Sequence, residues 1–198
     1  MKMKKGKVVM NNKWNKKNAI WMAVYAVIYA VFTVLVCVLG AIHPVMFVCY
    51  QITAGILLSG VTFYAFRRIQ APGIAAIFSL MIILLFVITG DAVPWHVIPV
   101  VVIGVLAEAV RFLCKYKWNG DVISTVIMSF STFGYYGQIW FNRTYTYECA
   151  VEEMPEGYAD TLMAVSPFWS LIAVSIAGVV LSVAITAVTA KIFKLEKN

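Results

Sequence analysis

Both histidines of the chain lie at short polar breaks between long apolar segments. His43 stands in the stretch GAIHP, and His96 stands in GDAVPWH together with Asp91 and Trp95. A neutral imidazole can bind a ligand or a metal ion, whereas a tryptophan at the edge of an apolar segment is also typical of the aromatic belt at a membrane surface. Two histidines so far apart in the sequence do not make a metal site, and we expect none. The two breaks are instead candidate ligand contacts or solvated interfacial positions.

A second group of polar and aromatic side chains marks the corresponding ends of other apolar segments. Its members are Gln51, Tyr135, Gln138, Trp140, Asn142, Phe168 and Trp169. Aromatic rings with polar tips give apolar walls that can also form hydrogen bonds, and amide side chains give directional hydrogen bonds, as small-molecule sites require. An interfacial belt combined with helix–helix contacts would use the same residue types. We predict that both groups line a pocket that opens outward.

The composition decides which class of fold must position these residues. Of the 198 residues, 62% are hydrophobic and only 13% are charged, and the mean hydropathy is +0.86. A soluble domain carries about 25% charged residues, and a chain of about 200 residues cannot bury this much apolar surface away from water. Because helices satisfy their own backbone hydrogen bonds in lipid, we predict an all-α integral membrane protein in the lipid bilayer.

Six segments are long enough to cross a membrane, for which a helix needs about 20 apolar residues. They are residues 19–39, 44–66, 71–89, 94–114, 122–141 and 165–190. The remaining chain comprises a basic tail over residues 1–18, an acidic outer loop over residues 142–160 and a short tail over residues 191–198. We therefore expect a membrane domain of six transmembrane helices over residues 19–190.

Lysine and arginine set the expected orientation of this domain. All of the 16 basic residues except Arg143 fall on one side of it, and basic residues accumulate on the cytoplasmic side of membrane proteins. We therefore expect a multi-pass protein of the bacterial plasma membrane with both termini cytoplasmic and the acidic loop outside. The net charge of +7 is then a signal of topology. It is spread over separate sites, so nucleic acid is not an expected partner.

Ionisable and reactive side chains are rare within the apolar segments. Glu108 and Arg111 lie three residues apart and share a helix face, which predicts a local ion pair or a contact for a cytoplasmic partner. The four cysteines have no CxxC or metal-binding spacing, so they behave as small hydrophobic residues. A disulfide between Cys37 and Cys49 remains compatible with their expected position near the outer surface.

The first apolar segment carries a face of small side chains. Ala19, Ala23, Ala26 and Ala30 recur at intervals of three or four residues, and such a face lets another helix approach closely. That helix belongs either to this chain or to a second membrane protein.

Several stretches resemble the S components of energy-coupling-factor (ECF) transporters, in particular the MptD-like group. They are GAIHPVMF, RRIQAPG, TGDAVPWHVIPVVVIGVLAEAVRF and YADTLMAVSPFW, and the similarity covers nearly the whole chain. The resemblance implies a subunit that captures a micronutrient and works with a transmembrane T component and two cytoplasmic ABC ATPases. It also implies that alanines of the first segment dock the T component. The substrate would lie among the outer parts of the last three segments, beneath a lid that contains His43.

The resemblance also bears on the substrate. Nickel and cobalt S components use a histidine near the extreme N-terminus, and the N-terminal tail of this chain has lysines but no histidine. The expected substrate is a vitamin-like heterocycle, or a tetrapyrrole such as haem with His43 or His96 as axial ligand.

Three classes of function compete at this level. The chain contains no GxxxxGK[ST] motif for binding nucleotide phosphates, so ATP would be used by partner proteins, and no cofactor of its own is expected. A stand-alone secondary transporter or channel is the alternative, although we find no internal repeat in the sequence. A membrane enzyme would need a third group beside Ser166 and His96. We therefore predict a transport subunit and not an enzyme.

Overall fold

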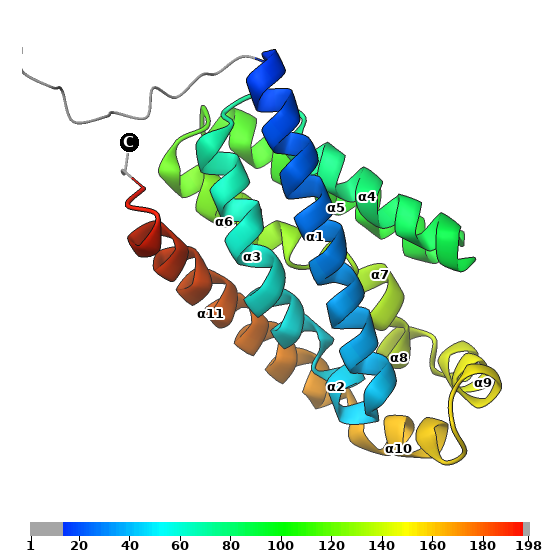
Figure 1. Ribbon diagram of the computed structural model, residues 1–198. Helices are drawn as coiled ribbons and strands as arrows, with labels where there is room; N and C mark the ends of the chain where they lie inside the picture. Colours follow the sequence, from blue (N-terminus) through cyan, green and yellow to red (C-terminus); the bar gives the residue numbers. More distant parts are fainter. Residues whose placement is uncertain (1–13, 196–198) are drawn as a thin grey trace, which may run out of the picture.

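The computed structural model describes residues 14–195, and all regular structure within them is helical. Its helices are α1 (Lys16–Ile42), α2 (Pro44–Val48), α3 (Tyr50–Arg68), α4 (Ile74–Thr89), α5 (Pro94–Leu113), α6 (Trp118–Met128), α7 (Phe133–Tyr136), α8 (Gln138–Phe141), α9 (Arg143–Glu153), α10 (Tyr158–Val165) and α11 (Phe168–Ile192). The start of α1 and the end of α11 lie at the same end of the bundle, and α9 and α10 lie at the opposite end (Figure 1). Most of the basic tail predicted at residues 1–18 lies outside the described residues.

Three of the described helices are long and apolar enough to cross a membrane, namely α1, α5 and α11. Helix α4 is also apolar but has only 16 residues. Helix α3 has 19 residues, but polar side chains such as Gln51, Ser59 and Thr62 lower its hydropathy. By length and composition, the described residues thus support an all-helical membrane protein with three candidate spans and one shorter apolar helix; the predicted set of six is not confirmed.

The fifth predicted segment, residues 122–141, differs most from expectation because its helix stops after Met128. The amide N–H groups of Phe130, Ser131 and Phe133 each donate to the carbonyl three residues earlier, at 2.8–3.0 Å. Hydrogen bonds of this spacing tighten the helix and rarely continue for long. The chain then forms the short helices α7 and α8, which change direction toward α9. The predicted outer loop at residues 142–160 is largely helical, as α9 and the start of α10.

Helices α3 and α11 pack closely because glycines stand where they cross. A Cβ atom added to Gly55 would lie 2.7 Å from the carbonyl oxygen of Gly178, and one added to Gly178 would lie 2.7 Å from the carbonyl oxygen of Gln51. One turn farther along, the hydroxyls of Ser59 and Ser182 hydrogen-bond at 2.7 Å. Small residues that let two backbones approach are typical of helix contacts in membranes, as are hydroxyl groups that bond across them.

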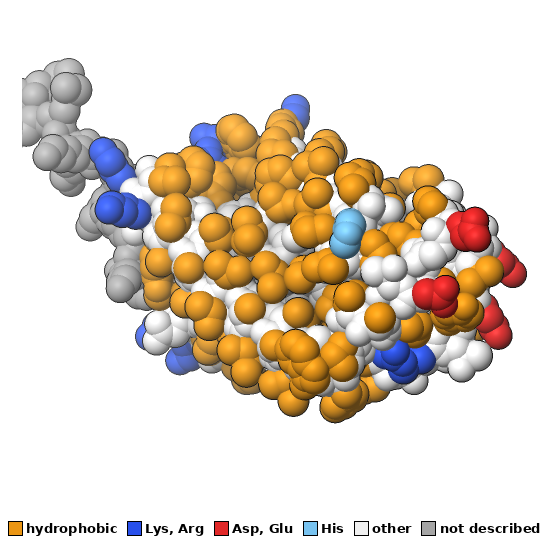
Figure 2. All heavy atoms as spheres, turned by 90° about the horizontal axis from the view of Figure 1, so that it is seen from below, with side chains coloured by type: hydrophobic (Ala, Val, Ile, Leu, Met, Phe, Trp, Pro, Cys, Tyr) orange, Lys and Arg blue, Asp and Glu red, His pale blue; other side chains and the backbone are white. Residues whose placement is uncertain are grey.

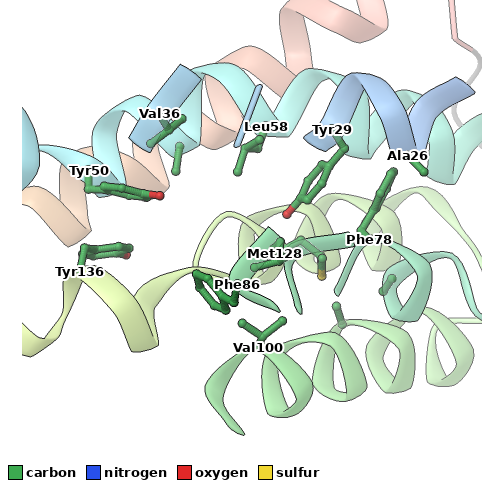
Figure 3. Close-up of a cluster of buried hydrophobic side chains, with 14 of the residues drawn as sticks. Ala26, Tyr29, Val36, Tyr50, Leu58, Phe78, Phe86, Val100, Met128 and Tyr136 are labelled. Atoms are coloured by element: carbon green, nitrogen blue, oxygen red, sulfur yellow. The ribbon is translucent and has the colours of Figure 1, made fainter. Parts of the chain in front are cut away.

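Aromatic side chains and a few polar groups fill the interior between the helices. Tyr29 of α1 stacks on Phe78 of α4, with ring centroids 4.4 Å apart (Figure 3), and its hydroxyl lies 2.8 Å from the Ser131 hydroxyl. Tyr50 and Tyr136 stack in the same way toward the other end of the cluster (Figure 3). These contacts hold α1, α3 and α4 against the segment that follows α6.

A buried cluster of charges joins α3, α5 and α6. The carboxylate of Asp121 accepts hydrogen bonds from Arg67 and Arg111, both at 3.0 Å. Arg111 also lies 3.5 Å from Glu108 and donates to backbone carbonyls between residues 66 and 71. The predicted pair of Glu108 and Arg111 is therefore confirmed, but as part of a larger cluster whose central acid is Asp121.

The two ends of the molecule carry opposite charge. Figure 2 shows lysine and arginine side chains at one end, aspartate and glutamate at the other, and a broad hydrophobic belt between them. Arg143 is the basic residue at the acidic end, as expected from the sequence. The four cysteines, all within the described residues, are free thiols, and the Cys37 sulfur hydrogen-bonds the Tyr50 hydroxyl instead of pairing with Cys49.

Candidate functional site

A cavity lies at the acidic end, between the ends of the long helices and the hairpin formed by α9 and α10. The long-helix side contributes Phe47, Asp91, His96, Tyr135 and Gln138. Helix α9 contributes Tyr145, Thr146, Cys149, Ala150 and Glu153. Met154 and two residues of α10, Tyr158 and Leu162, complete the lining. The cavity has a volume of about 70 Å³, room for a few water molecules or one small solute.

The position of His96 follows from the break between α4 and α5. Gly90 ends α4 in the left-handed conformation, at φ 88°, and Pro94 starts α5 where its missing N–H costs little. The turn brings the carbonyl of Asp91 to 2.8 Å from Nδ1 of His96. Since a carbonyl oxygen can only accept, Nδ1 carries the hydrogen and Nε2 of the neutral ring is an acceptor. His96 is 3% exposed, so a ligand would reach its ring mainly through the cavity.

Tyr135 reaches the cavity because α7 lies tightly against α5. A Cβ atom added to Gly134 would lie 2.6 Å from the carbonyl oxygen of Trp95, so only glycine permits this approach. The Tyr135 ring packs edge-on against His96 at 5.0 Å. Gln138, one turn on, donates from its amide nitrogen to the Gly134 carbonyl at 2.7 Å, which leaves its amide oxygen available to the cavity.

The opposite wall comes from one face of α9. Tyr145 packs edge-on against the exposed Trp95 at 5.5 Å, and burial together with a hydrogen bond to Cys149 raises the pKa of its phenol. Thr146 donates its hydroxyl to the Asn142 carbonyl at 3.1 Å. The Tyr145 phenol is therefore neutral, and the hydroxyl groups of Tyr145 and Thr146 are both engaged by hydrogen bonds to nearby residues.

Three contacts hold α9 and α10 over the cavity. Tyr158 of α10 donates its hydroxyl to the Gly40 carbonyl of α1 at 2.6 Å, and burial raises the pKa of Tyr158 to about 12. The guanidinium of Arg143 donates to the carbonyls of Met163 and Ser166 at 2.9 and 2.7 Å. The Tyr147 hydroxyl lies 3.0 Å from the Asp160 carboxylate. The hairpin is thus a cover fixed mainly by backbone contacts.

The structure brings part of the predicted site together and separates the rest. Asp91, His96, Tyr135 and Gln138 line the cavity. Gln51 and Trp140 are buried elsewhere, where Gln51 bonds Ser129 and Tyr136 and Trp140 bonds Ser170. The exposed residues are His43, Trp95, Asn142, Phe168 and Trp169. His43 caps α2 through Nδ1, which accepts from the Val45 N–H at 3.1 Å.

Residues of α9 and α10 were missed because their segment reads as a polar outer loop. Tyr145, Cys149 and Glu153 stand four residues apart, which places them on one face of a helix, and this spacing is the signal that could have revealed them. Phe47 gave no comparable signal because it lies within a long apolar segment.

The four alanines of α1 differ in exposure. Ala19 and Ala23 are exposed and Ala30 is half-buried, while Ala26 is 5% exposed and packs within the protein. Only part of the small-residue face is therefore open to a partner helix. Among the described residues no group of three or more His, Cys, Asp or Glu side chains is placed to hold a metal ion.

Comparison with known proteins gives a family for this architecture. Residues 16–196 match the model of the Trep_Strep family, described as hypothetical bacterial integral membrane proteins. No curated protein matches the chain, and no solved structure does. The match spans nearly all of the described helices, including those that form the cavity. The chain therefore belongs to the Trep_Strep family of bacterial integral membrane proteins.

Proposed function

We propose that this protein is the substrate-capturing S component of an ECF-type ABC importer. It would bind a micronutrient in the cavity at its acidic end and deliver it inward together with a transmembrane T component and two ABC ATPases. The observation that carries the proposal is the cavity itself, which is covered by a short helical hairpin and lies at the end opposite both described chain ends. If basic residues mark the cytoplasmic side, this cavity opens to the outside.

The dimensions of the cavity guide the choice of substrate. A vitamin-like heterocycle is favoured over a haem-like tetrapyrrole, because a tetrapyrrole is larger than the present space and would require α9 and α10 to move apart. Of the two histidines only His96 lines this cavity, so His96 is favoured over His43 as an axial ligand.

The open part of the alanine face supports a docking role for α1. Ala19 and Ala23 are exposed, and small exposed side chains allow a partner helix to approach closely. Ala26 is the less suitable test position because it is buried within this protein, so that a bulky replacement would disturb the fold.

The proposal is tested by purifying the tagged protein from native membranes in mild detergent and identifying co-purifying proteins by mass spectrometry. We expect a T-type membrane protein and two ABC ATPases. Ala23→Trp should release them, whereas Ile28→Trp, at an exposed position five residues on and therefore on another face of α1, should not. Recovery of the protein alone, under conditions that keep a known ECF importer intact, would contradict the proposal and favour the stand-alone secondary transporter.

A further inference from the structure

The hydrogen-bonding groups that line the cavity are unequally available. Most donors are already engaged by backbone carbonyls: His96 Nδ1 by Asp91, the Gln138 amide nitrogen by Gly134, and the Tyr158 hydroxyl by Gly40. The Thr146 hydroxyl is engaged in the same way. The remaining lining donors, which have no carbonyl partner, are the phenols of Tyr135 and Tyr145 and the weakly donating thiol of Cys149, and Tyr145 and Cys149 hydrogen-bond each other.

The groups left facing the cavity are mainly acceptors. Nε2 of His96 carries a lone pair because its partner nitrogen holds the hydrogen. The amide oxygen of Gln138 is also available, because the hydrogen bond to the Gly134 carbonyl uses the amide nitrogen. A ligand that fits such a wall must bring its own N–H or O–H donors, since two acceptors that face each other leave both unsatisfied.

The charge of the lining points to a cation. Asp91 and Glu153 contribute two carboxylates to the lining. Glu153 is exposed, and one oxygen of Asp91 accepts a hydrogen bond from the Thr89 hydroxyl at 2.6 Å, which leaves its other oxygen for a ligand. None of the lining residues, all within residues 14–195, is a lysine or an arginine. Arg143 lies at the same end of the molecule, but its guanidinium is held by carbonyl groups outside the lining.

The walls suit an organic cation better than a metal ion. Phe47, Tyr135 and Tyr145 present aromatic rings, whose faces attract organic cations such as ammonium groups. A divalent metal would instead need three or more ligating side chains close together, and the described residues hold no such group.

We propose that this cavity binds a small protonated amine, an organic cation whose N–H groups donate to His96, Gln138 and the carboxylates of Asp91 and Glu153. This inference rests on the proposed function for the role of the cavity as a capture site, and it names the substrate class of that site. The expected ligand is a compact molecule that carries an alkylammonium group on an aromatic or heterocyclic ring, since the free space is small and the walls are rings.

The test measures binding to the purified full-length protein in nanodiscs by isothermal titration calorimetry, with three probes of matched shape. Benzylamine is the cation with N–H donors, benzyl alcohol is neutral, and benzoate is an anion. We expect benzylamine to bind at least about tenfold more tightly than the other two, as the gain of a charge-assisted hydrogen bond implies. Equal binding of the three probes, a preference for benzoate, or no binding of benzylamine would overturn the proposal.

Matched charge variants locate the bound cation. The double variant Asp91→Asn with Glu153→Gln should weaken benzylamine binding at least about tenfold. The control Glu148→Gln with Glu152→Gln removes the same charge from exposed positions on α9 that do not line the cavity, and should leave binding unchanged. An equal loss in both double variants would overturn the proposal. The probe comparison on the unaltered protein decides the matter even if the cavity variant fails to fold.

The amine proposal and the importer proposal fail separately. Benzylamine binding without co-purifying ATPases would retain the amine site and remove the importer assignment. Co-purification of the T component and ATPases without any preference for benzylamine would retain the importer and remove the amine as its substrate class.

Discussion

Asp121 is the residue on which the buried charge cluster depends. Its carboxylate is fully buried and pairs with both Arg67 and Arg111. Asp121→Asn therefore removes the acid that the two buried guanidinium groups share, and the other acid of the cluster, Glu108, is partly exposed and pairs with Arg111. Breaking a buried ion pair in this way costs about 3–5 kcal/mol. We expect a clearly lower unfolding temperature in detergent, measured by intrinsic fluorescence.

The control for this substitution is Glu156→Gln, which removes an exposed carboxylate at the opposite end and should change the unfolding temperature little. If Asp121→Asn and Glu156→Gln unfold at the same temperature, the cluster contributes nothing measurable to stability. Its role would then have to be sought outside the energetics of folding.

Single residues also show what the sequence could and could not reveal about the site. His96 and Asp91 were predictable because a glycine, a proline and a tryptophan mark the break in which they stand. Glu153 was hidden among the other acids of residues 142–160. It is exposed as they are, and only the helix formed there shows that it also lines the cavity. Gln51 was misleading because a buried amide that bonds within the core has the same sequence signature as one that faces a ligand.

The crossing of α3 and α11 depends on the absence of side chains at two positions. Gly178→Leu would place its Cβ atom 2.7 Å from the Gln51 carbonyl oxygen, closer than real contacts allow, so the helices must move apart. Overpacking of this kind costs typically about 1–3 kcal/mol. We expect a lower unfolding temperature and a changed environment of the buried Tyr136, which bonds Gln51.

The matched control is Ala173→Leu, which adds bulk to the same helix at an exposed position and should be tolerated. Equal stability of the two leucine variants would show that the close contact at Gly178 is not required.

The α9–α10 hairpin is held by contacts that can be loosened one at a time. Arg143→Gln removes the donors that bond the carbonyls of Met163 and Ser166. Each of these two hydrogen bonds contributes a net ~1 kcal/mol, so loss of both should make the hairpin open roughly thirtyfold more often. Cys149 lines the cavity beneath it. Its rate of modification by a maleimide, followed by mass spectrometry, should rise by about that factor.

Cys114 provides an internal control because it lies at the far end of α5 and should react at an unchanged rate. An increase at both cysteines would indicate general destabilisation, and no increase at Cys149 would show that Arg143 does not hold the cover.

At the level of elements, the sequence predicted apolar helices better than it predicted their interruptions. The segment at residues 165–190 is long and apolar throughout and appears as α11 with nearly the same bounds. The segment at residues 122–141 is also mostly hydrophobic, but it is richer in serine, threonine, glycine and tyrosine taken together, and its helix ends at Met128. Its serines bond neighbouring carbonyls and residues of other helices. Such bonds depend on packing that hydropathy along the chain does not record.

The separation of charge along the molecule gives its expected orientation. Basic residues gather at the end that carries both described chain ends, and acidic residues gather around the hairpin (Figure 2). A membrane favours the arrangement in which the basic end faces the cytoplasm. The same arrangement exposes the cavity to solutes outside the cell, so the proposed capture of a substrate from outside requires this orientation.

Orientation is tested by placing one cysteine at each end, with the unaltered protein as the background. Glu156→Cys lies between α9 and α10, and Lys191→Cys lies in the last turn of α11; both positions are exposed. In intact cells a membrane-impermeant maleimide should label the first variant above background and leave the second at background until the membrane is permeabilised. The opposite pattern would place the cavity in the cytoplasm, which is incompatible with uptake from outside. Labelling of both in intact cells would mean that the described bundle does not separate its charged ends across the bilayer.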